Sequence, residues 1–365
     1  MKVALVVGHL GLGGAERVAI QLADGLSQLG HTMTIYILSR DKEFYQKPDN
    51  VEFVYLSDMS NPRSALIRNI NYLRVLRQLL LKNEVDIAVS FLPFTNVRVL
   101  LASFGTNTPI IVTEHSIPGY GSMHWMWRIL RRALYMSAAK LVSVSKGVDE
   151  CFSWLPQDKR NVIFNSLPSK IDLSSNLPPI WKRHKHWVIA VGRLTSSKRF
   201  DLLISAFSEI SGHYPDWGLA IVGEGELSQL LTHQLMLRGM ADKIHLFGRL
   251  DNPFVAMANA EFLVLSSDYE GFGNVIMEAM AVSTPCISTD CHSGPREIIT
   301  QNVDGFLVPV GEVKSLSAAM ARMMSDQVWR KELAENTKSA VQRFEFTKIT
   351  KEWQDLLIEC VVNRK

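Results

Sequence analysis

Two glutamates, Glu270 and Glu278, are the residues whose type and spacing most clearly suggest chemistry. They flank a glycine-rich run, and their separation along the chain is a little more than two turns of helix. If a helix begins at Asn274, both carboxylates can project from one face toward its N-terminus. Free backbone N–H groups at that end favour an anionic or hydroxyl-rich ligand. The spacing therefore indicates a site for a sugar nucleotide, with one acid near the sugar and the other near a ribose.

Two cations occupy a second turn, which follows the strand-like run that ends in Val191. Arg193 comes directly after Gly192, and Lys198 follows a few residues later. An arginine can hold a phosphate with a fork of two N–H donors, and a lysine can hold one as a point charge. Exposure to solvent is the simplest explanation for either residue. An arginine placed at a strand end after a glycine nevertheless favours phosphate binding.

Glycines mark three more turns after strand-like runs. The first turn, from Gly8 to Gly14, lacks the G-x-G-x-x-G spacing of dinucleotide-binding folds, and no acid ends the next strand-like run. The later turns contain Gly223 and the run Gly248-Arg249-Leu250, where backbone could lie against a nucleotide base. Ordinary tight connections explain each of these turns equally well.

A histidine and an arginine-rich stretch stand out in the first half of the chain. His115 follows a strand-like run directly, which places it at a sheet edge, although a lone histidine is more often structural. Between Ser122 and Met136, Arg128, Arg131 and Arg132 share one helical face beside tryptophans and methionines. This stretch is either a packed helix with a solvated edge or a helix that binds an anionic membrane surface or a lipid diphosphate.

The elements that must position these residues alternate between strand-like and helical patterns, which is typical of parallel sheets. We predict an α/β fold with two doubly wound, Rossmann-like domains facing a cleft, in which the ligand lies at the carboxyl ends of both sheets. The domains are residues 1–168 and 169–344, and a helix in 345–365 crosses back to the first domain. The strand-like runs are Val3–Val7, Thr32–Leu38, Val51–Leu56, Ile87–Ser90, Ile110–Thr113, Leu141–Val144, Trp187–Val191, Trp217–Val222, Lys243–Phe247, Phe262–Ser266, Pro285–Thr289 and Gly305–Val308.

Composition narrows the class of protein. The chain has 365 residues, which favours two cores, and its net charge of +3 is uneven: residues 1–165 carry 18 Lys and Arg against 13 Asp and Glu. The four cysteines form neither a C-x-x-C pair nor a zinc pattern, which predicts reduced thiols and a cytoplasmic location. No stretch is long and apolar enough for a membrane span. We expect no metal, no cofactor and no nucleic acid partner.

Taken together, these landmarks resemble the retaining glycosyltransferases of the GT-B fold, family 4. The resemblance rests on Gly13-Gly14, Glu114-His115, Gly192-Arg193 with Lys198, Gly223-Glu224-Gly225 and the run from Glu270 to Glu278. Ser90-Phe91-Leu92, Thr95-Asn96, Glu114-His115-Ser116 and the Trp127-Arg128 to Arg131-Arg132 helix further resemble bacterial transferases that extend undecaprenyl-diphosphate-linked glycans with N-acetylgalactosamine.

The resemblance implies a role for each of these residues. It implies that Gly14, Arg193 and Lys198 bind the donor diphosphate and that Glu278 binds the ribose. Glu270 and the backbone of Gly271, Phe272, Gly273, Asn274 and Val275 would bind the donor sugar. His115 would lie beside the reacting carbon, with Gly223, Arg249 and Leu250 in the base-binding region and Arg128, Arg131 and Arg132 on the acceptor pyrophosphate.

The expected activity is retaining, metal-independent transfer from a UDP-sugar to a polyprenyl-diphosphate glycan at the cytoplasmic face of the inner membrane. One alternative keeps the fold but uses GDP-mannose and acts on lipopolysaccharide or capsule. The other is a catalytically silent sugar-nucleotide-binding protein, and the presence of Glu270, Glu278, Arg193, Lys198 and His115 argues against it.

Overall fold

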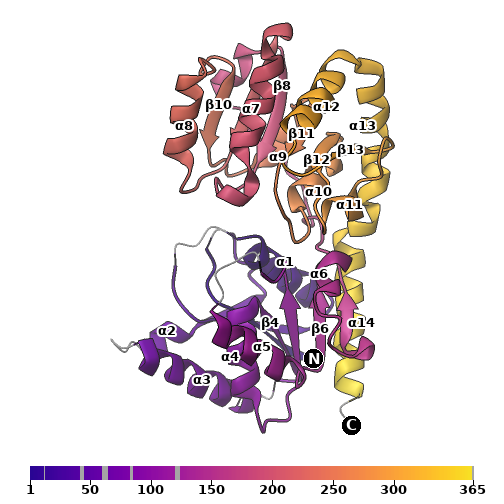
Figure 1. Cartoon of the computed structure of the whole chain (residues 1–365). Coiled ribbons are helices and arrows are strands. Elements are labelled where there is room, and N and C mark those ends of the chain that lie inside the picture. Colours follow the sequence, from indigo (N-terminus) through magenta and orange to yellow (C-terminus); the bar gives the residue numbers. More distant parts are fainter. Residues whose placement is uncertain (12, 42–44, 60–64, 83–84, 120–123, 364–365) are drawn as a thin grey trace. The chain divides into compact units, whose positions relative to one another are not determined.

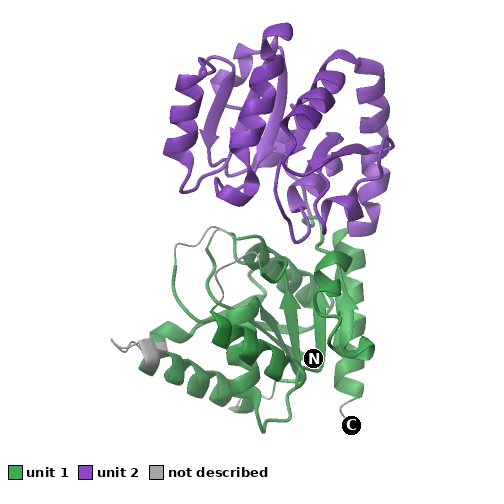
Figure 2. Ribbon diagram, viewed as in Figure 1, with its two compact units in different colours: residues 1–169, 345–365 green, residues 170–344 purple. Residues whose placement is uncertain are grey.

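A computed structural model describes residues 1–11, 13–41, 45–59, 65–82, 85–119 and 124–363. It consists of two compact units, the first formed by residues 1–169 and 345–365 and the second by residues 170–344 (Figure 2). Each unit has its own parallel sheet and its own hydrophobic core. The predicted α/β class with two doubly wound, Rossmann-like domains is therefore confirmed.

Unit 1 is built on a seven-stranded parallel sheet with the order β3-β2-β1-β4-β5-β6-β7 (Figure 1). Its strands are β1 (Lys2–Val7), β2 (Thr32–Ile37), β3 (Val51–Tyr55), β4 (Ile87–Phe91), β5 (Ile110–Glu114), β6 (Lys140–Ser143) and β7 (Arg160–Val162). Its helices are α1 (Gly14–Gln28), α2 (Leu56–Met59), α3 (Ala65–Lys82), α4 (Pro93–Ser103), α5 (Trp125–Tyr135), α6 (Lys146–Glu150) and α14 (Phe346–Val362), with a 3₁₀ turn, η1 (Gln157–Lys159).

The strand order of unit 1 reverses between β1 and β4. Both strands are buried along nearly their whole length, as expected when helices cover both faces of a parallel sheet. Ligands of such sheets bind beyond the carboxyl ends of the strands at this reversal. The glycine turn that leads from β1 into α1 lies at that end of the sheet.

The C-terminal helix α14 belongs to unit 1. It packs against α1 and β4, and Ile349, Trp353 and Leu357 are buried in the same core as the sheet. At Gly25 of α1, a Cβ atom would lie 2.5 Å from Oγ1 of Thr350, so only glycine allows this close approach of the two helices. Helix α14 therefore packs into the same hydrophobic core as β1 and α1.

Unit 2 is built on a six-stranded parallel sheet with the order β10-β9-β8-β11-β12-β13. Its strands are β8 (His186–Val191), β9 (Trp217–Val222), β10 (Ile244–Gly248), β11 (Phe262–Leu265), β12 (Cys286–Thr289) and β13 (Gly305–Val308). Its helices are α7 (Phe200–Ile210), α8 (Ser228–Leu237), α9 (Pro253–Ala258), α10 (Asn274–Ala281), α11 (Pro295–Ile298), α12 (Val313–Ser325) and α13 (Gln327–Val341), with 3₁₀ turns η2 (Pro179–Arg183), η3 (Ser196–Lys198), η4 (Ser211–His213) and η5 (Gln342–Phe344).

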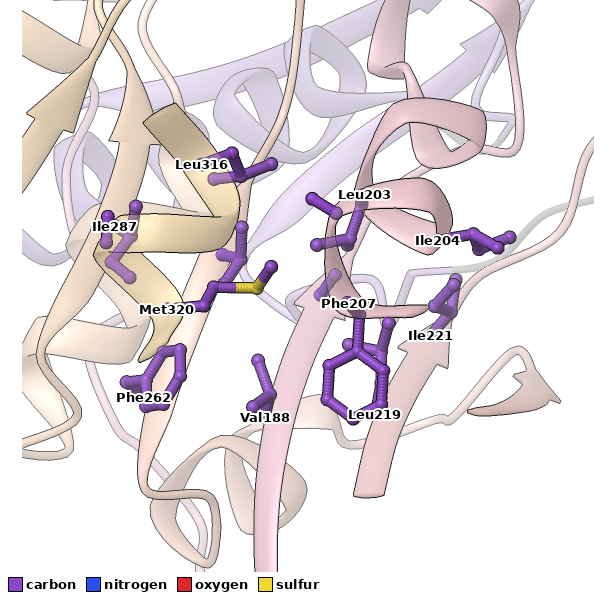
Figure 3. Packing of buried hydrophobic residues seen from close by; sticks show 14 of the residues in the cluster. Val188, Leu203, Ile204, Phe207, Leu219, Ile221, Phe262, Ile287, Leu316 and Met320 are labelled. Carbon is purple, nitrogen blue, oxygen red and sulfur yellow. The ribbon is translucent and has the colours of Figure 1, made fainter. Parts of the chain in front are cut away.

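The core of unit 2 lies between this sheet and the helices α7 and α12. Figure 3 shows Phe207 of α7 and Met320 of α12 packed over the strands, beside Val188 and Phe262. The sheet reverses its order between β8 and β11, so the loops after these two strands are neighbours at the carboxyl end. These are the loops that carry Lys198 and Glu270.

Candidate functional site in unit 2 and polar cluster in unit 1

Lys198 and Glu270 meet at the order reversal of the unit 2 sheet. Nζ of Lys198 lies 2.5 Å from Oε1 of Glu270, and both side chains are largely buried. Lys198 ends the turn η3 after β8, and Glu270 lies in the loop after β11. The structure therefore joins a predicted phosphate-binding cation to the predicted sugar-binding acid.

Serines that the sequence reasoning missed fix this pair. The hydroxyl of Ser267 donates to Oε1 of Glu270 at 2.6 Å, and that of Ser293 donates to the Glu270 carbonyl oxygen at 2.5 Å. Ser266 donates to the carbonyl oxygen of Lys198 at 2.8 Å. These bonds hold both loops in place. Serine is so common in loops that its type alone gave no signal.

Helix α10 begins at Asn274, so Glu270 lies outside it. The prediction that a helix begins at Asn274 is confirmed, and because the chain turns through a left-handed Gly273 just before it, Glu270 belongs to the loop and not to a face of α10. Glu278 is buried on α10. Gly271 and Val275 are partly exposed, as is Asn274, whereas the Phe272 ring is buried edge-on against Phe344, 5.3 Å away. At Phe272 only the backbone is therefore available to a ligand.

The glycines of the predicted base-binding region hold strand ends together. Gly223 has φ +148°, and a Cβ atom there would lie 1.9 Å from the carbonyl oxygen of Gly192. Its N–H donates to the carbonyl oxygen of Gly248 at 2.7 Å. Arg249 and Leu250, both half-buried, follow directly. Gly223 thus has a packing role that does not require a ligand.

Arg193 and Gly14, the other predicted diphosphate contacts, are both exposed. Arg193 follows β8, two residues beyond its end, on the same loop as Lys198. Gly14 is the first residue of α1 in unit 1. Unit 2 therefore presents Arg193 and Lys198 on one loop, and Gly14 belongs to the other unit.

Next to the Lys198–Glu270 pair, Arg199 occupies the left-handed region, with φ 49°. Its guanidinium bonds to Asp201 and to Asp268, with the shortest distance 3.0 Å. This cluster borders a hollow of about 380 Å³, which is also lined by Tyr269. The sequence reasoning did not single out these residues.

His115 lies just beyond β5 in unit 1 and is held as a neutral ring. Its Nε2 is 3.0 Å from Oγ1 of Thr113, whose hydroxyl donates to the carbonyl oxygen of Ser90. Because that hydroxyl has one hydrogen, Nε2 must donate to it. The Phe91 ring stacks on the imidazole at 5.5 Å, and burial lowers the pKa of His115 to about 4. At neutral pH, Nδ1 therefore carries the free lone pair.

Glu114, next to His115, lies in a buried polar cluster. Tyr135 of α5 donates to its Oε1 at 2.5 Å, and Arg131 lies 3.9 Å from the same oxygen. Burial raises the pKa of Glu114 to about 7, against the lowering effects of Arg131 and Tyr135. The cluster links the end of β5 to the arginine-rich helix.

The three arginines of α5 differ from one another in the structure. Arg128 and Arg132 are exposed, and Arg132 lies over the Trp154 ring at 4.8 Å. Arg131 instead turns toward Glu114. All three arginines lie on α5 at the predicted helical spacing, but only Arg128 and Arg132 are exposed. Ser122 and Met123, at the start of the predicted stretch, lie outside the described residues.

Two kinds of feature are absent from the described residues. No three or more His, Cys, Asp or Glu side chains in this part of the chain gather as a metal site. No helix among these residues combines the length and the apolar character needed to cross a bilayer.

Comparisons with known proteins agree on one class. The profile of the family described as Glycosyltransferase Family 4 matches residues 12–167, and that of Glycosyl transferases group 1 matches residues 179–340. A solved structure, Anabaena Alr3699/HepE in complex with UDP, superposes with a TM-score of 0.80 at 20% identity, covering 98% of this chain and 100% of that one. That likeness is one of fold.

Two proteins of Campylobacter jejuni match along nearly the whole chain. One is named as the α-1,4-N-acetyl-D-galactosaminyltransferase of GalNAc-α-(1→4)-GalNAc-α-(1→3)-diNAcBac-PP-undecaprenol; it is 27% identical and the match covers 98% of this chain and 99% of that protein. The other, N-acetylgalactosamine-N,N′-diacetylbacillosaminyl-diphospho-undecaprenol 4-α-N-acetylgalactosaminyltransferase, is 29% identical, with 96% and 98% covered. The chain therefore belongs to the glycosyltransferases of the GT-B fold, with a family 4 domain followed by a group 1 domain.

Proposed function

We propose that this glycosyltransferase moves an N-acetylhexosamine or a hexose from a UDP-sugar to a polyprenyl-diphosphate-linked glycan, in the assembly of bacterial surface polysaccharide or glycoprotein glycans. The observation that carries the proposal is the Lys198–Glu270 pair at the sheet reversal of unit 2. The names of the two Campylobacter relatives support the lipid-linked acceptor. The UDP held by the Anabaena neighbour supports the donor nucleotide.

In the proposed reaction, unit 2 binds the donor. Arg193, Lys198 and the N-terminus of α10 neutralise the diphosphate, whose charge rises as the bond to the sugar breaks. The Glu270 carboxylate accepts hydrogen bonds from the sugar hydroxyls, and the backbone N–H groups from Gly271 to Val275 donate hydrogen bonds to the sugar. The Glu278 carboxylate accepts a hydrogen bond from a ribose hydroxyl. These cationic and backbone groups can take up the leaving-group charge, and we propose that no metal or cofactor is required.

We propose that the anomeric configuration is retained. Common UDP-hexoses carry an α-linked sugar, and the Campylobacter relatives are named for α linkages, which supports retention. The acceptor hydroxyl would attack on the face that the diphosphate leaves, and its proton would pass to the departing diphosphate oxygen. His115 is the unit 1 residue assigned to the reacting carbon, where its neutral ring can accept a hydrogen bond at Nδ1.

Unit 1 is proposed to bind the acceptor at the cytoplasmic face of the inner membrane. Exposed apolar side chains of α5 lie beside Arg128 and Arg132, a combination that suits an anionic lipid surface. The structure joins none of the four cysteines in a disulfide, and reduced thiols support the proposed cytoplasmic location.

Nucleotide release tests the proposal. The purified chain is incubated with each common UDP-sugar and GDP-sugar, with and without a short polyprenyl-diphosphate glycan. We expect acceptor-dependent release of UDP from one UDP-sugar, together with a lengthened glycan. Release from GDP-mannose would instead support the mannosyl alternative. A chain that binds UDP but releases no nucleotide with any donor would be a silent binding protein.

A further inference from the structure

Arg131 of α5 is held near a buried carboxylate without being bonded to it. Its side chain is 14% exposed, and its guanidinium lies 5.4 Å over the Phe152 ring. Nη1 of Arg131 is 3.9 Å from Oε1 of Glu114, which is too far for a hydrogen bond. The two charges therefore attract each other, but among the described residues no hydrogen bond fixes the guanidinium in this position.

The carboxylate of Glu114, in contrast, is fixed. Nδ2 of Asn96 donates to the Tyr135 hydroxyl at 2.8 Å, and that hydroxyl donates to Oε1 of Glu114. The same Asn96 nitrogen donates to the carbonyl oxygen of Thr113 at 2.9 Å. Oε2 of Glu114 has no hydrogen-bond partner in the described part of the chain. A buried carboxylate with so few partners is poorly suited to staying ionised once its counter-charge leaves.

We propose that Glu114 is a positioning residue for the acceptor: it withdraws Arg131 from the α5 surface until the acceptor diphosphate draws the arginine out to join Arg128 and Arg132. This inference rests on the proposed function. A guanidinium gains bidentate hydrogen bonds from phosphate oxygens that Glu114 does not give it. When Arg131 leaves, Glu114 takes up a proton, so acceptor binding and proton uptake are coupled.

The titratable and charged groups around Glu114 determine whether acceptor binding strengthens or weakens as pH rises. Those that face it in the described residues are Arg131 and Tyr135 of α5 and Cys151 after α6. Burial raises the pKa of Tyr135 well above its usual value and also raises the pKa of the Cys151 thiol. With its pKa raised to about 7, Glu114 is the group of this cluster that titrates near neutrality. Because the acceptor-bound state holds the extra proton, acceptor binding weakens as pH rises through this range.

Acceptor kinetics at about pH 6 and about pH 8.5 test the proposal, using a polyprenyl-diphosphate glycan whose two phosphates do not titrate in between. For the unchanged chain we expect acceptor KM to rise about threefold to tenfold over this range while donor KM stays flat. Glu114→Gln keeps an acceptor for Tyr135 but removes the charge, so its acceptor KM should be low and independent of pH. The matched control Arg128→Ala should have a higher KM with the slope retained.

A pH slope that persists in Glu114→Gln would overturn the proposal, as would a slope that survives in Arg131→Ala. If Glu114→Gln does not fold, Tyr135→Phe is the second variant. It removes a hydrogen bond to the ionised carboxylate of Glu114, so the pH midpoint of the rise in acceptor KM should move upward. An unmoved midpoint would count against the proposal. Acceptor binding followed by tryptophan fluorescence gives the same comparison without turnover. Failure of the proposed transfer reaction is thus distinguishable from failure of this inference.

Discussion

At the residue scale, the Lys198–Glu270 ion pair explains how a cation that we propose to bind phosphate can stay charged and largely buried before the donor arrives. An ammonium with no nearby counter-charge would be expensive to bury, and Glu270 supplies that charge at 2.5 Å. The donor would bring two phosphate charges of its own. In the proposed reaction, Glu270 would then leave its ion pair and accept hydrogen bonds from sugar hydroxyls, while the hydrogen bond from Ser267 would hold its carboxylate in place.

Two substitutions should separate the partners of this pair. Lys198→Met removes a charge-assisted phosphate contact worth about 1.5–3 kcal/mol, so the Kd for UDP should rise about tenfold or more. Glu270→Gln should leave UDP binding unchanged or slightly tighter but lower turnover about a hundredfold, because the sugar contact is weakened. Calorimetry with UDP and turnover with the full donor measure the two effects. Equal UDP affinity in Lys198→Met and the unchanged chain would contradict the assignment.

The sequence could predict the two charged residues of this pair but not the neighbouring side chains that hold them in place. Lys198 and Glu270 follow strand-like runs, and a cation and an acid at strand ends already indicate a ligand. Ser293 donates to the carbonyl oxygen of Glu270 from a loop 23 residues later in the sequence, and no local sequence pattern reveals such a contact. The position of the Arg131 side chain could not be predicted, because helical spacing gives the face of a residue but not the buried acid toward which its long side chain bends.

At the scale of elements, α14 joins the last residues of the chain to the core of unit 1. Its buried face packs on α1, whereas its other face is exposed. Leu357 is fully buried, and Ile358, the next residue, is exposed. The two neighbours therefore form a matched pair for measuring what this contact contributes.

Leu357→Ala should destabilise unit 1 by about 2–5 kcal/mol, the range for a leucine removed from a packed core. Ile358→Ala should change stability by less than about 1 kcal/mol, because its side chain stays in contact with water. Hydrogen exchange of peptides from β1 and α1 measures the effect, with peptides from β8 and α7 as an internal reference. Similar protection in the two variants would mean that α14 adds little to the core.

Strands were predicted well where burial dictates their composition. The run Ile110–Thr113 is mostly apolar because β5 is buried along its whole length, and such a signal is visible in the sequence. Strand β7, with the sequence Arg160-Asn161-Val162, was missed because it is three residues long, lies at the sheet edge and has polar side chains. Edge strands need less apolar surface, so their periodicity is weak.

At the scale of the whole molecule, positive charge and exposed apolar surface occur together in the first half of the chain. Residues 1–165 carry the excess of Lys and Arg. On α5 of unit 1, Trp125 is 62% and Ile129 58% exposed, next to Arg128. Unit 2 also exposes an apolar side chain, Leu237 of α8 at 75%, but its half of the sequence lacks that positive excess. We therefore expect an anionic membrane surface to bind unit 1 more tightly than unit 2.

Vesicle binding tests this distinction on the full chain. Replacing Trp125 and Ile129 by Ser should weaken binding to vesicles that contain anionic lipid by about tenfold or more, because each buried apolar side chain contributes about 1.5–3 kcal/mol. Leu237→Ser should leave binding unchanged. Added salt should weaken binding by the unchanged chain, since screening reduces the attraction of Arg128 and its neighbours to the lipid. Co-sedimentation measures all three, and an equal loss in Leu237→Ser would show that lipid contact is not specific to unit 1.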